Sequence, residues 1–352
     1  MKKGIILQAF IMFLLSYQIF AQNFEIKSPD NNITLRVKID EQISWSVSLK
    51  ENIVIETAKV GMDFSAGQDF GLNPKLQGNS INSHSSMIYP AVPHKDAKIK
   101  DEFTELSLSF KGNYSIKFRA YNDGVAYQFI DKGKINRNVV NERLSITFPE
   151  DTRSLFPQEE SMYSHNERSY LDKSLKEISS KDFCSLPVMF VTKKGKILFT
   201  ETALHDYPGM FLKGSGNLTM EAIFPKYVLE VAPNKNAPDR NQTIVKEGDY
   251  IAQVSGNRAY PWRVFIISND DRTFVESNLT YQMAQPTAIG NTDWIKPGKV
   301  AWDWYNANNI FGVDFKSGLN TATYKYYIDF AASNKIEYVI LDLNKMIETY
   351  HH

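Results

Sequence analysis

Short segments in which apolar and polar residues alternate dominate the first three quarters of the chain. Between about residues 23 and 277, apolar or aromatic side chains occupy every second position in residues 34–37, 43–49, 107–110 and 115–121. A period of two is typical of a β-strand with one buried face. Turn-forming residues separate these segments, as at residues 29–32 and 111–113. The pattern predicts a mainly β fold, a large antiparallel β-super-sandwich over residues 22–285.

The pattern changes after residue 278. Residues 286–299 contain Gly and Pro and are predicted to form a linker, which a strand at 300–305 follows. Residues 321–334 are predicted to form a helix capped by Asn320, whose apolar face comprises Tyr324, Tyr327, Ile328 and Ala331. A second strand is predicted at 336–341. Two strands joined by a helix form a β-α-β unit with a parallel sheet.

A single β-α-β unit cannot cover both faces of a parallel sheet. Either residues 300–352 dock wholly on the sandwich, or they begin a larger domain of which most is missing, and we expect the second. The polar stretch 158–181 is expected to form a loop or a short surface helix.

The first 21 residues are typical of a signal peptide. Lys2 and Lys3 precede an apolar stretch over residues 5–20, and the small residue Ala21 follows it. The stretch is shorter than the roughly 20 apolar residues that a membrane-spanning helix needs. We therefore expect cleavage, no permanent membrane anchor, and a periplasmic or secreted protein.

Composition narrows the class of ligand. The chain has 40 basic and 40 acidic residues, so no basic surface for nucleic acid is expected. Aromatic residues make up 13% of the chain and suit flat ligands such as sugar rings. The single cysteine, Cys184, excludes an intrachain disulfide. We expect a monomer.

Three segments carry candidate chemistry. The turn-rich residues 199–209, which include Glu201, suit a hard cation such as calcium, although a solvated hairpin has the same composition. Trp302, Asp303 and Trp304 end the first predicted strand of the β-α-β unit, where sites of parallel α/β folds form, and they can stack on and hydrogen-bond a sugar. The same aromatic residues also suit a core. Asp342 ends the next strand and is a candidate for the same rim, or for a helix cap.

The segment at residues 258–263 is interpreted as structural. Its arginines are expected to fix the sandwich against the next domain rather than to bind a ligand.

Several motifs, in order along the chain, carry a resemblance to a known family. They are SPD (28–30), YNDGVAY (121–127), TE with YPG (200–201 and 207–209), PWRV (261–264), AWDWYN (301–306), YKYYIDFA (324–331) and YVILD (338–342). Together these motifs resemble family 97 of the glycoside hydrolases. The resemblance implies an exported bacterial α-glycosidase with an N-terminal β-super-sandwich, a central (β/α)8 barrel, a C-terminal β domain and a bound calcium ion.

The resemblance also implies roles for individual residues. Glu201 matches the sandwich glutamate that ligates calcium, and Trp302, Asp303 and Trp304 match the first barrel strand, at the rim of the sugar pocket. Asp342, which ends the next strand, is expected at the same rim. The Trp-Asp-Trp form favours the retaining α-galactosidase type over the α-glucosidase type, with an α-linked oligosaccharide or glycoside as ligand.

In the family, the catalytic carboxylates lie on later barrel strands, and an acidic residue, Gly and Trp follow the second strand. Here residues 343–346 are LNKM instead. We therefore expect a truncated barrel without catalytic residues, and no hydrolysis by this chain alone. The alternative is a non-catalytic carbohydrate-binding or interaction module.

Overall fold

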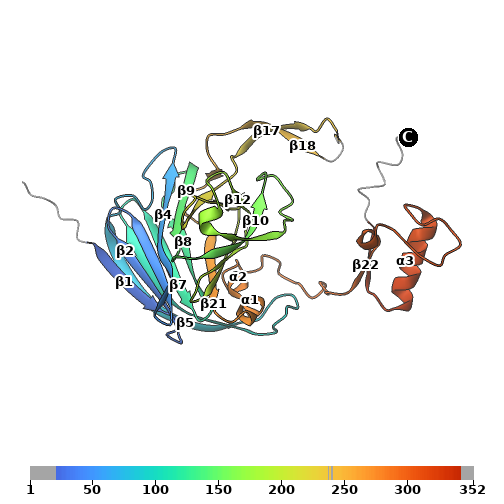
Figure 1. Ribbon diagram of the computed structural model, residues 1–352, viewed down its shortest axis with the longest axis horizontal. Helices are drawn as coiled ribbons and strands as arrows, with labels where there is room; N and C mark the ends of the chain where they lie inside the picture. The colour runs from blue at the N-terminus through green and yellow to red at the C-terminus, as the bar shows by residue number, and fades with distance from the viewer. Residues whose placement is uncertain (1–20, 237, 239–240, 342–352) are drawn as a thin grey trace, which may run out of the picture. The chain divides into compact units, whose positions relative to one another are not determined.

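The computed structural model describes residues 21–236, 238 and 241–341. The chain divides into two compact units, which are described separately (Figure 1). Residues 1–88 and 100–285 form the sandwich unit, and residues 89–99 and 286–352 form the C-terminal unit. The signal-peptide prediction for residues 1–21 concerns residues that, except for the last, lie outside the described part.

The first layer of the sandwich unit is built on antiparallel neighbours that follow one another in sequence. They are β1 (Gln22–Lys27), β2 (Ile33–Ile39), β3 (Ile43–Leu49) and β4 (Asn52–Phe64), and β4 then pairs with β9 (Arg137–Thr147). The far edge of β9 pairs with two short strands, β16 (Thr219–Ile223) and β19 (Ala252–Val254). The layer continues from β16 through β15 (Phe211–Lys213) and β12 (Phe183–Cys184) to β10 (Arg153–Glu159).

The second layer is also antiparallel and places the C-terminal strand of the unit at its centre. Its hydrogen-bonded order is β6 (Ile99–Phe110), β7 (Tyr114–Tyr121), β8 (Gly124–Asp131), β21 (Trp262–Ser268), β14 (Lys196–Thr202), β13 (Val188–Val191), β10 and β11 (Tyr170–Ser174). The short β20 (Arg258–Ala259) also pairs with β8, and β5 (Leu76–Ile88) belongs to the same sheet. Because β10 pairs in both layers, the two form one continuous hydrogen-bonded sheet.

Aromatic side chains fill the space between the layers. Trp45 of β3 packs edge-on against Phe265 of β21 at 5.0 Å between ring centroids, and Phe265 stacks on Phe199 of β14 at 4.4 Å. Successive side chains of β21 lie on opposite faces of the sheet. Phe265 and Ile267 therefore lie in this core, and Trp262, Val264 and Ile266 lie on the opposite face. Two short helices, α1 (Arg272–Glu276) and α2 (Leu279–Gln282), follow β21, and Leu279 and Met283 cover that opposite face. As a result β21 is buried on both sides.

Two features of the sandwich unit depart from the alternation of apolar and polar residues that predicts most of its strands. The stretch 158–181, expected as a loop or a surface helix, contains the strand β11 and the short 3-10 helix η1 (Leu175–Glu177). β11 is an edge strand with its side chains largely exposed, which explains why it lacks an apolar alternation. A separate two-stranded ribbon, β17 (Val228–Pro233) with β18 (Gln242–Glu247), projects from the sandwich (Figure 1).

The C-terminal unit contains a parallel β-α-β element. β22 (Val300–Trp302) pairs in parallel with β23 (Tyr338–Ile340), and α3 (Thr321–Ser333) connects them. The predicted helix and its cap are confirmed, since the side chain of Asn320 accepts a hydrogen bond from the Thr323 amide at 3.0 Å. Ile328 is 49% exposed, so its prediction as part of the buried face is wrong; Ala331 and Thr323 are the buried residues of α3.

The strand predicted at 300–305 is shorter than expected. It ends at Trp302, and the chain continues as a 3-10 helix, η2 (Asp303–Asn306). Ala307 and Asn308 then adopt left-handed backbone conformations, with φ of 54° and 57°. Bending at this point turns the chain away from the strand direction, so that the Trp-Asp-Trp segment spans the end of β22.

The mainly β, antiparallel prediction is confirmed for the sandwich unit. No helix in the described part of the chain is long and apolar enough to cross a membrane. The incomplete (β/α)8 barrel remains a prediction, because a single β-α-β element is common to many parallel folds.

Candidate functional site

Glu201 lies on the inner face of the second layer. It is on β14, directly opposite Arg263 of the neighbouring β21. Phe199 and Phe265, two residues away on each strand, point into the same core. Although the sequence placed Glu201 in a turn-rich stretch, the turn begins only after Thr202, where β14 ends.

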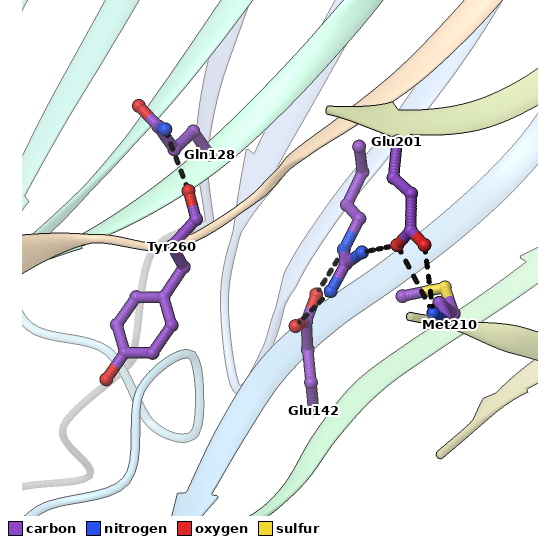
Figure 2. Close-up of polar contacts among 6 residues, drawn as sticks. Gln128, Glu142, Glu201, Met210 and Tyr260 are labelled. Atoms are coloured by element: carbon purple, nitrogen blue, oxygen red, sulfur yellow. Dashed lines mark hydrogen bonds and ion pairs between the residues drawn. The ribbon is translucent and has the colours of Figure 1, made fainter. Parts of the chain in front are cut away.

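Arg263 joins two carboxylates from the two layers. Its Nε and Nη2 atoms donate to the two oxygens of Glu142 on β9, at 2.8 and 2.7 Å, a bidentate pair across the sandwich. Its Nη1 atom donates to Glu201. Figure 2 shows the Glu142 and Glu201 carboxylates approaching the guanidinium group from two sides. We call Glu142, Arg263 and Glu201 the buried charge cluster.

The main chain also holds Glu201. The Met210 amide donates to both of its carboxylate oxygens, at 3.1 and 3.3 Å (Figure 2). Met210 precedes β15, so the segment that follows β14 folds back over the end of its own strand. This contact and the pair with Arg263 fix the carboxylate of Glu201 in one orientation.

Burial sets the electrostatics of the cluster. Burial raises the pKa of the Glu201 carboxyl, although Arg263 and the Met210 amide oppose this shift. Burial lowers the pKa of Arg263, but the two carboxylates outweigh it and raise the pKa overall. When all three groups are ionised, the cluster carries one excess negative charge inside the sandwich.

Aromatic rings enclose this charge. The Arg263 guanidinium carbon lies 5.9 Å from the ring centre of Tyr207 and 5.6 Å from that of Phe224. Tyr127, the register partner of Arg263 on β8, is also fully buried, and its hydroxyl has no hydrogen-bond partner within the described chain. Glu142 is buried and the Glu201 side chain is only 9% exposed, so both carboxylates depend on Arg263 for charge compensation.

The cluster does not by itself fit a calcium ion. Calcium takes six to eight oxygen ligands in proteins. Glu201 instead faces a guanidinium group, and no group of three or more His, Cys, Asp or Glu side chains that could hold a metal ion occurs among residues 21–236, 238 and 241–341. A calcium site at Glu201 therefore needs further oxygen ligands besides the acidic side chains that the described residues place there.

The Trp-Asp-Trp segment lies at the end of β22, in the C-terminal unit. Trp302 is 39% exposed, Asp303 is fully buried and Trp304 is half-buried. The Asp303 carbonyl accepts hydrogen bonds from the Asn308 amide at 2.9 Å and from the Tyr327 hydroxyl of α3 at 3.4 Å. The structure thus brings Trp302, Asp303 and Trp304 together at one strand end, with Trp302 as the exposed surface. Asp342 lies outside the described residues, and Glu201 belongs to the other unit.

The sequence interpretation missed the connection between Glu142 and Arg263. Arg263 was assigned to fixing the sandwich against the next domain, whereas its contacts with Glu142 and Glu201 lie inside the sandwich unit. One signal was available, because an arginine within the apolar strand WRVFIIS needs a buried partner. Glu142 lies in NERLS, which alternates like an ordinary strand, so nothing distinguished it.

Comparison with known proteins assigns both units to one protein family. The family model described as Glycosyl-hydrolase 97 N-terminal matches residues 26–286, and that described as Glycoside hydrolase 97 matches residues 302–351. The chain therefore belongs to glycoside hydrolase family 97.

Two curated relatives carry names that specify an activity. The chain is 35% identical over 357 residues to the retaining alpha-galactosidase of Bacteroides thetaiotaomicron, which covers 97% of this chain and 53% of that protein. It is 22% identical over 305 residues to a probable retaining alpha-galactosidase of Streptomyces bingchenggensis, covering 85% of this chain and 42% of that protein. The chain thus spans about half the length of these relatives.

Solved structures show the same fold. A family 97 enzyme from Pseudoalteromonas sp. strain K8, in complex with panose, superposes with a TM-score of 0.73 at 21% identity, covering 90% of this chain and 46% of that one. The same enzyme has been solved with acarbose. A beta-arabinopyranosidase has the same TM-score at 22% identity, covering 90% of this chain and 50% of that one.

Proposed function

We propose that this chain supplies the N-terminal sandwich and the first β-α-β unit of the catalytic (β/α)8 barrel of a retaining α-galactosidase. The observation that carries the proposal is the 35% identity to a retaining alpha-galactosidase over nearly the whole chain. The position of Trp302 supports it, because an exposed indole at the carboxyl end of a parallel strand suits the face of a sugar ring. The panose and acarbose complexes of a relative with this fold support an α-linked oligosaccharide as the class of ligand.

Turnover by the complete enzyme that this chain is proposed to begin, called the native gene product below, tests the activity. We expect hydrolysis of p-nitrophenyl α-galactoside with kcat/KM about tenfold or more above that for p-nitrophenyl α-glucoside, because hydrogen bonds to one hydroxyl group separate these epimers. Proton NMR of the first product should show α-galactose, the anomer that retention requires. Faster hydrolysis of the glucoside, or β-galactose as the first product, would contradict the assignment.

The 352-residue chain alone forms the second arm of the same assay. Glycoside hydrolysis needs two carboxylates that flank the bond, and the family resemblance assigns both to later barrel strands. We expect no release of nitrophenol above the blank by the purified chain. Measurable turnover would mean that its own carboxylates carry the reaction.

We also propose that Glu201 is one ligand of a calcium ion in the native gene product. Support comes from the family motif and from the fixed orientation of its carboxylate. Glu201→Gln is expected to weaken calcium binding about tenfold or more in equilibrium dialysis of that product. Asp172→Asn is the matched control, since Asp172 pairs with Arg153 at the surface. Equal affinities of the two variants would remove Glu201 from the site.

The remaining expectations concern location and assembly. We propose a monomeric protein, periplasmic or secreted after removal of residues 1–21, without a nucleic-acid partner. The apolar stretch after Lys2 and Lys3 and the balanced charge of the chain support this. Mass spectrometry of the native protein checks the proposed cleavage, since recovery of an intact N-terminus would contradict it.

A further inference from the structure

A polar pocket of about 560 Å³ opens on the second layer of the sandwich, in the sandwich unit alone. Strands β5 to β8, β21 and the segment around α2 contribute its walls. This volume is typical of a small-molecule site. No residue of the buried charge cluster or of the Trp-Asp-Trp segment lines it.

The floor of the pocket is rigid. Arg119 of β7 lies between two aromatic rings, 4.1 Å from the ring centre of Phe103 and 4.6 Å from that of Trp262. Its Nε atom donates to Glu105 at 2.8 Å, and Lys117 lies 3.0 Å from the other oxygen of the same carboxylate. Stacking and ion pairing together restrict the guanidinium group, which reduces the entropy that it would lose on binding a ligand.

One wall carries an acceptor without a donor. Asp101 is 8% exposed, and its Oδ1 atom is buried with no hydrogen-bond partner within the described chain. Its Oδ2 atom lies 3.5 Å from the Nε2 atom of His84, which stacks on Phe103. Burial raises the pKa of Asp101, against the effects of His84 and Arg119. Because Oδ1 has almost no accessible surface, Asp101 meets the pocket with the rest of its side chain, and Oδ2, which His84 approaches only at 3.5 Å, is the oxygen that can accept from a ligand hydroxyl.

The other polar groups define the chemistry of the ligand. Asp101 and Glu105 balance Lys117 and Arg119, so the pocket has no excess charge to attract an ion. Asn82, Ser83, Gln128, Gln282 and Gln285 also line the pocket and offer both donors and acceptors. An apolar ligand would leave these groups unsatisfied, and a ligand carboxylate would face Asp101.

We propose that this pocket is an accessory carbohydrate site, which binds one or two neutral pyranose residues through their hydroxyl groups, with Asp101 as a hydrogen-bond acceptor. Its ligand class follows from the lining of the pocket, which lies in the sandwich unit. It gives the sandwich a sugar-binding role in addition to a structural one.

Titration of the chain with D-galactose and D-glucose, followed by NMR chemical shifts, tests the site. We expect saturable binding of at least one sugar with Kd on the order of 1 mM. D-Galacturonate is expected to bind at least about tenfold more weakly than D-galactose, since its carboxylate meets Asp101. Absence of saturation by either neutral sugar, or tighter binding of the uronate, would overturn the proposal.

Variants locate the binding. Asp101→Asn is expected to weaken binding about tenfold, because the amide retains the shape but replaces an ionised acceptor. Ser83→Trp fills the pocket from an exposed strand position and should abolish binding without touching Asp101. Asp172→Asn, the same chemical change on an exposed strand, should leave Kd within about twofold. Unchanged Kd in Ser83→Trp would place the sugar elsewhere and refute the site, even if Asp101→Asn fails to fold.

Discussion

Replacement of Arg263 by methionine is expected to lower the free energy of unfolding by about 3–5 kcal/mol. The guanidinium group is fully buried and is the partner of both Glu142 and Glu201, so its removal leaves two carboxylates in a core without compensation. Methionine retains much of the volume and isolates the effect of charge from that of a cavity. Urea denaturation of the chain, followed by tryptophan fluorescence, measures the change.

Two further variants separate charge from packing. Arg153→Met removes an arginine of an exposed pair with Asp172 and should leave the denaturation midpoint almost unchanged. Replacement of the whole cluster, with leucine at Glu142 and Glu201 and methionine at Arg263, should recover much of the lost stability, because apolar residues can replace a buried ion cluster at little cost. A loss below about 1 kcal/mol for Arg263→Met, or no recovery in the triple variant, would mean that the cluster does not depend on charge compensation.

The cluster also bears on metal binding. A guanidinium group beside Glu201 opposes the approach of a divalent cation, yet it fixes the carboxylate that the cation would use. A second carboxylate, Glu142, also compensates the charge of Arg263, through a bidentate contact. If the proposed calcium ion binds Glu201, Glu142 would lower the electrostatic cost of its approach, a role that the motif around Glu201 does not reveal.

The elements that were predicted correctly are mostly those that depend on local signals in the sequence. Residues 43–49 form β3 with the predicted bounds, because one face meets the core and the other meets solvent. Asn320 caps α3 because the cap depends only on residues three positions apart. β11 was missed because an exposed edge strand has no buried face to impose alternation. Ile328 was misplaced because what covers a helix depends on distant residues, which local periodicity does not contain.

The candidate site could be predicted only in part for a similar reason. Glu201 and the Trp-Asp-Trp segment were identified through contiguous motifs. The partner of Arg263, Glu142, lies 121 residues away on the opposite layer, and no local pattern links them. The accessory pocket likewise combines strands that meet only in the folded sheet, so neither Asp101 nor Arg119 stood out in the sequence.

Gly124 of the YNDGVAY motif is expected to be intolerant of even a methyl group. A Cβ atom there would lie 2.7 Å from Leu279 Cδ1 and still closer to the Phe265 carbonyl oxygen, well inside the van der Waals contact distance of carbon and oxygen. Gly124 pairs with Ile266 across β8 and β21, and the Ile267 amide donates to the Asp123 carbonyl at 2.8 Å, so neither backbone can move without losing this end of the ladder. Gly124→Ala should lower the free energy of unfolding by about 1–3 kcal/mol, measured by urea denaturation.

Gly78 of β5 provides the matched control. A Cβ atom at this position would meet nothing within 4 Å, so Gly78→Ala should change the free energy of unfolding by no more than about 0.5 kcal/mol. The two variants add the same methyl group to a strand and differ only in whether a second backbone lies against it. The strand β21 that Gly124 approaches also carries Arg263 on its inner face and Trp262 on its outer face. Displacement of β21 by the methyl group should therefore also weaken sugar binding in the accessory pocket. A Gly124→Ala variant as stable as Gly78→Ala would show that β8 and β21 can separate there, and that the glycine of the motif serves another purpose.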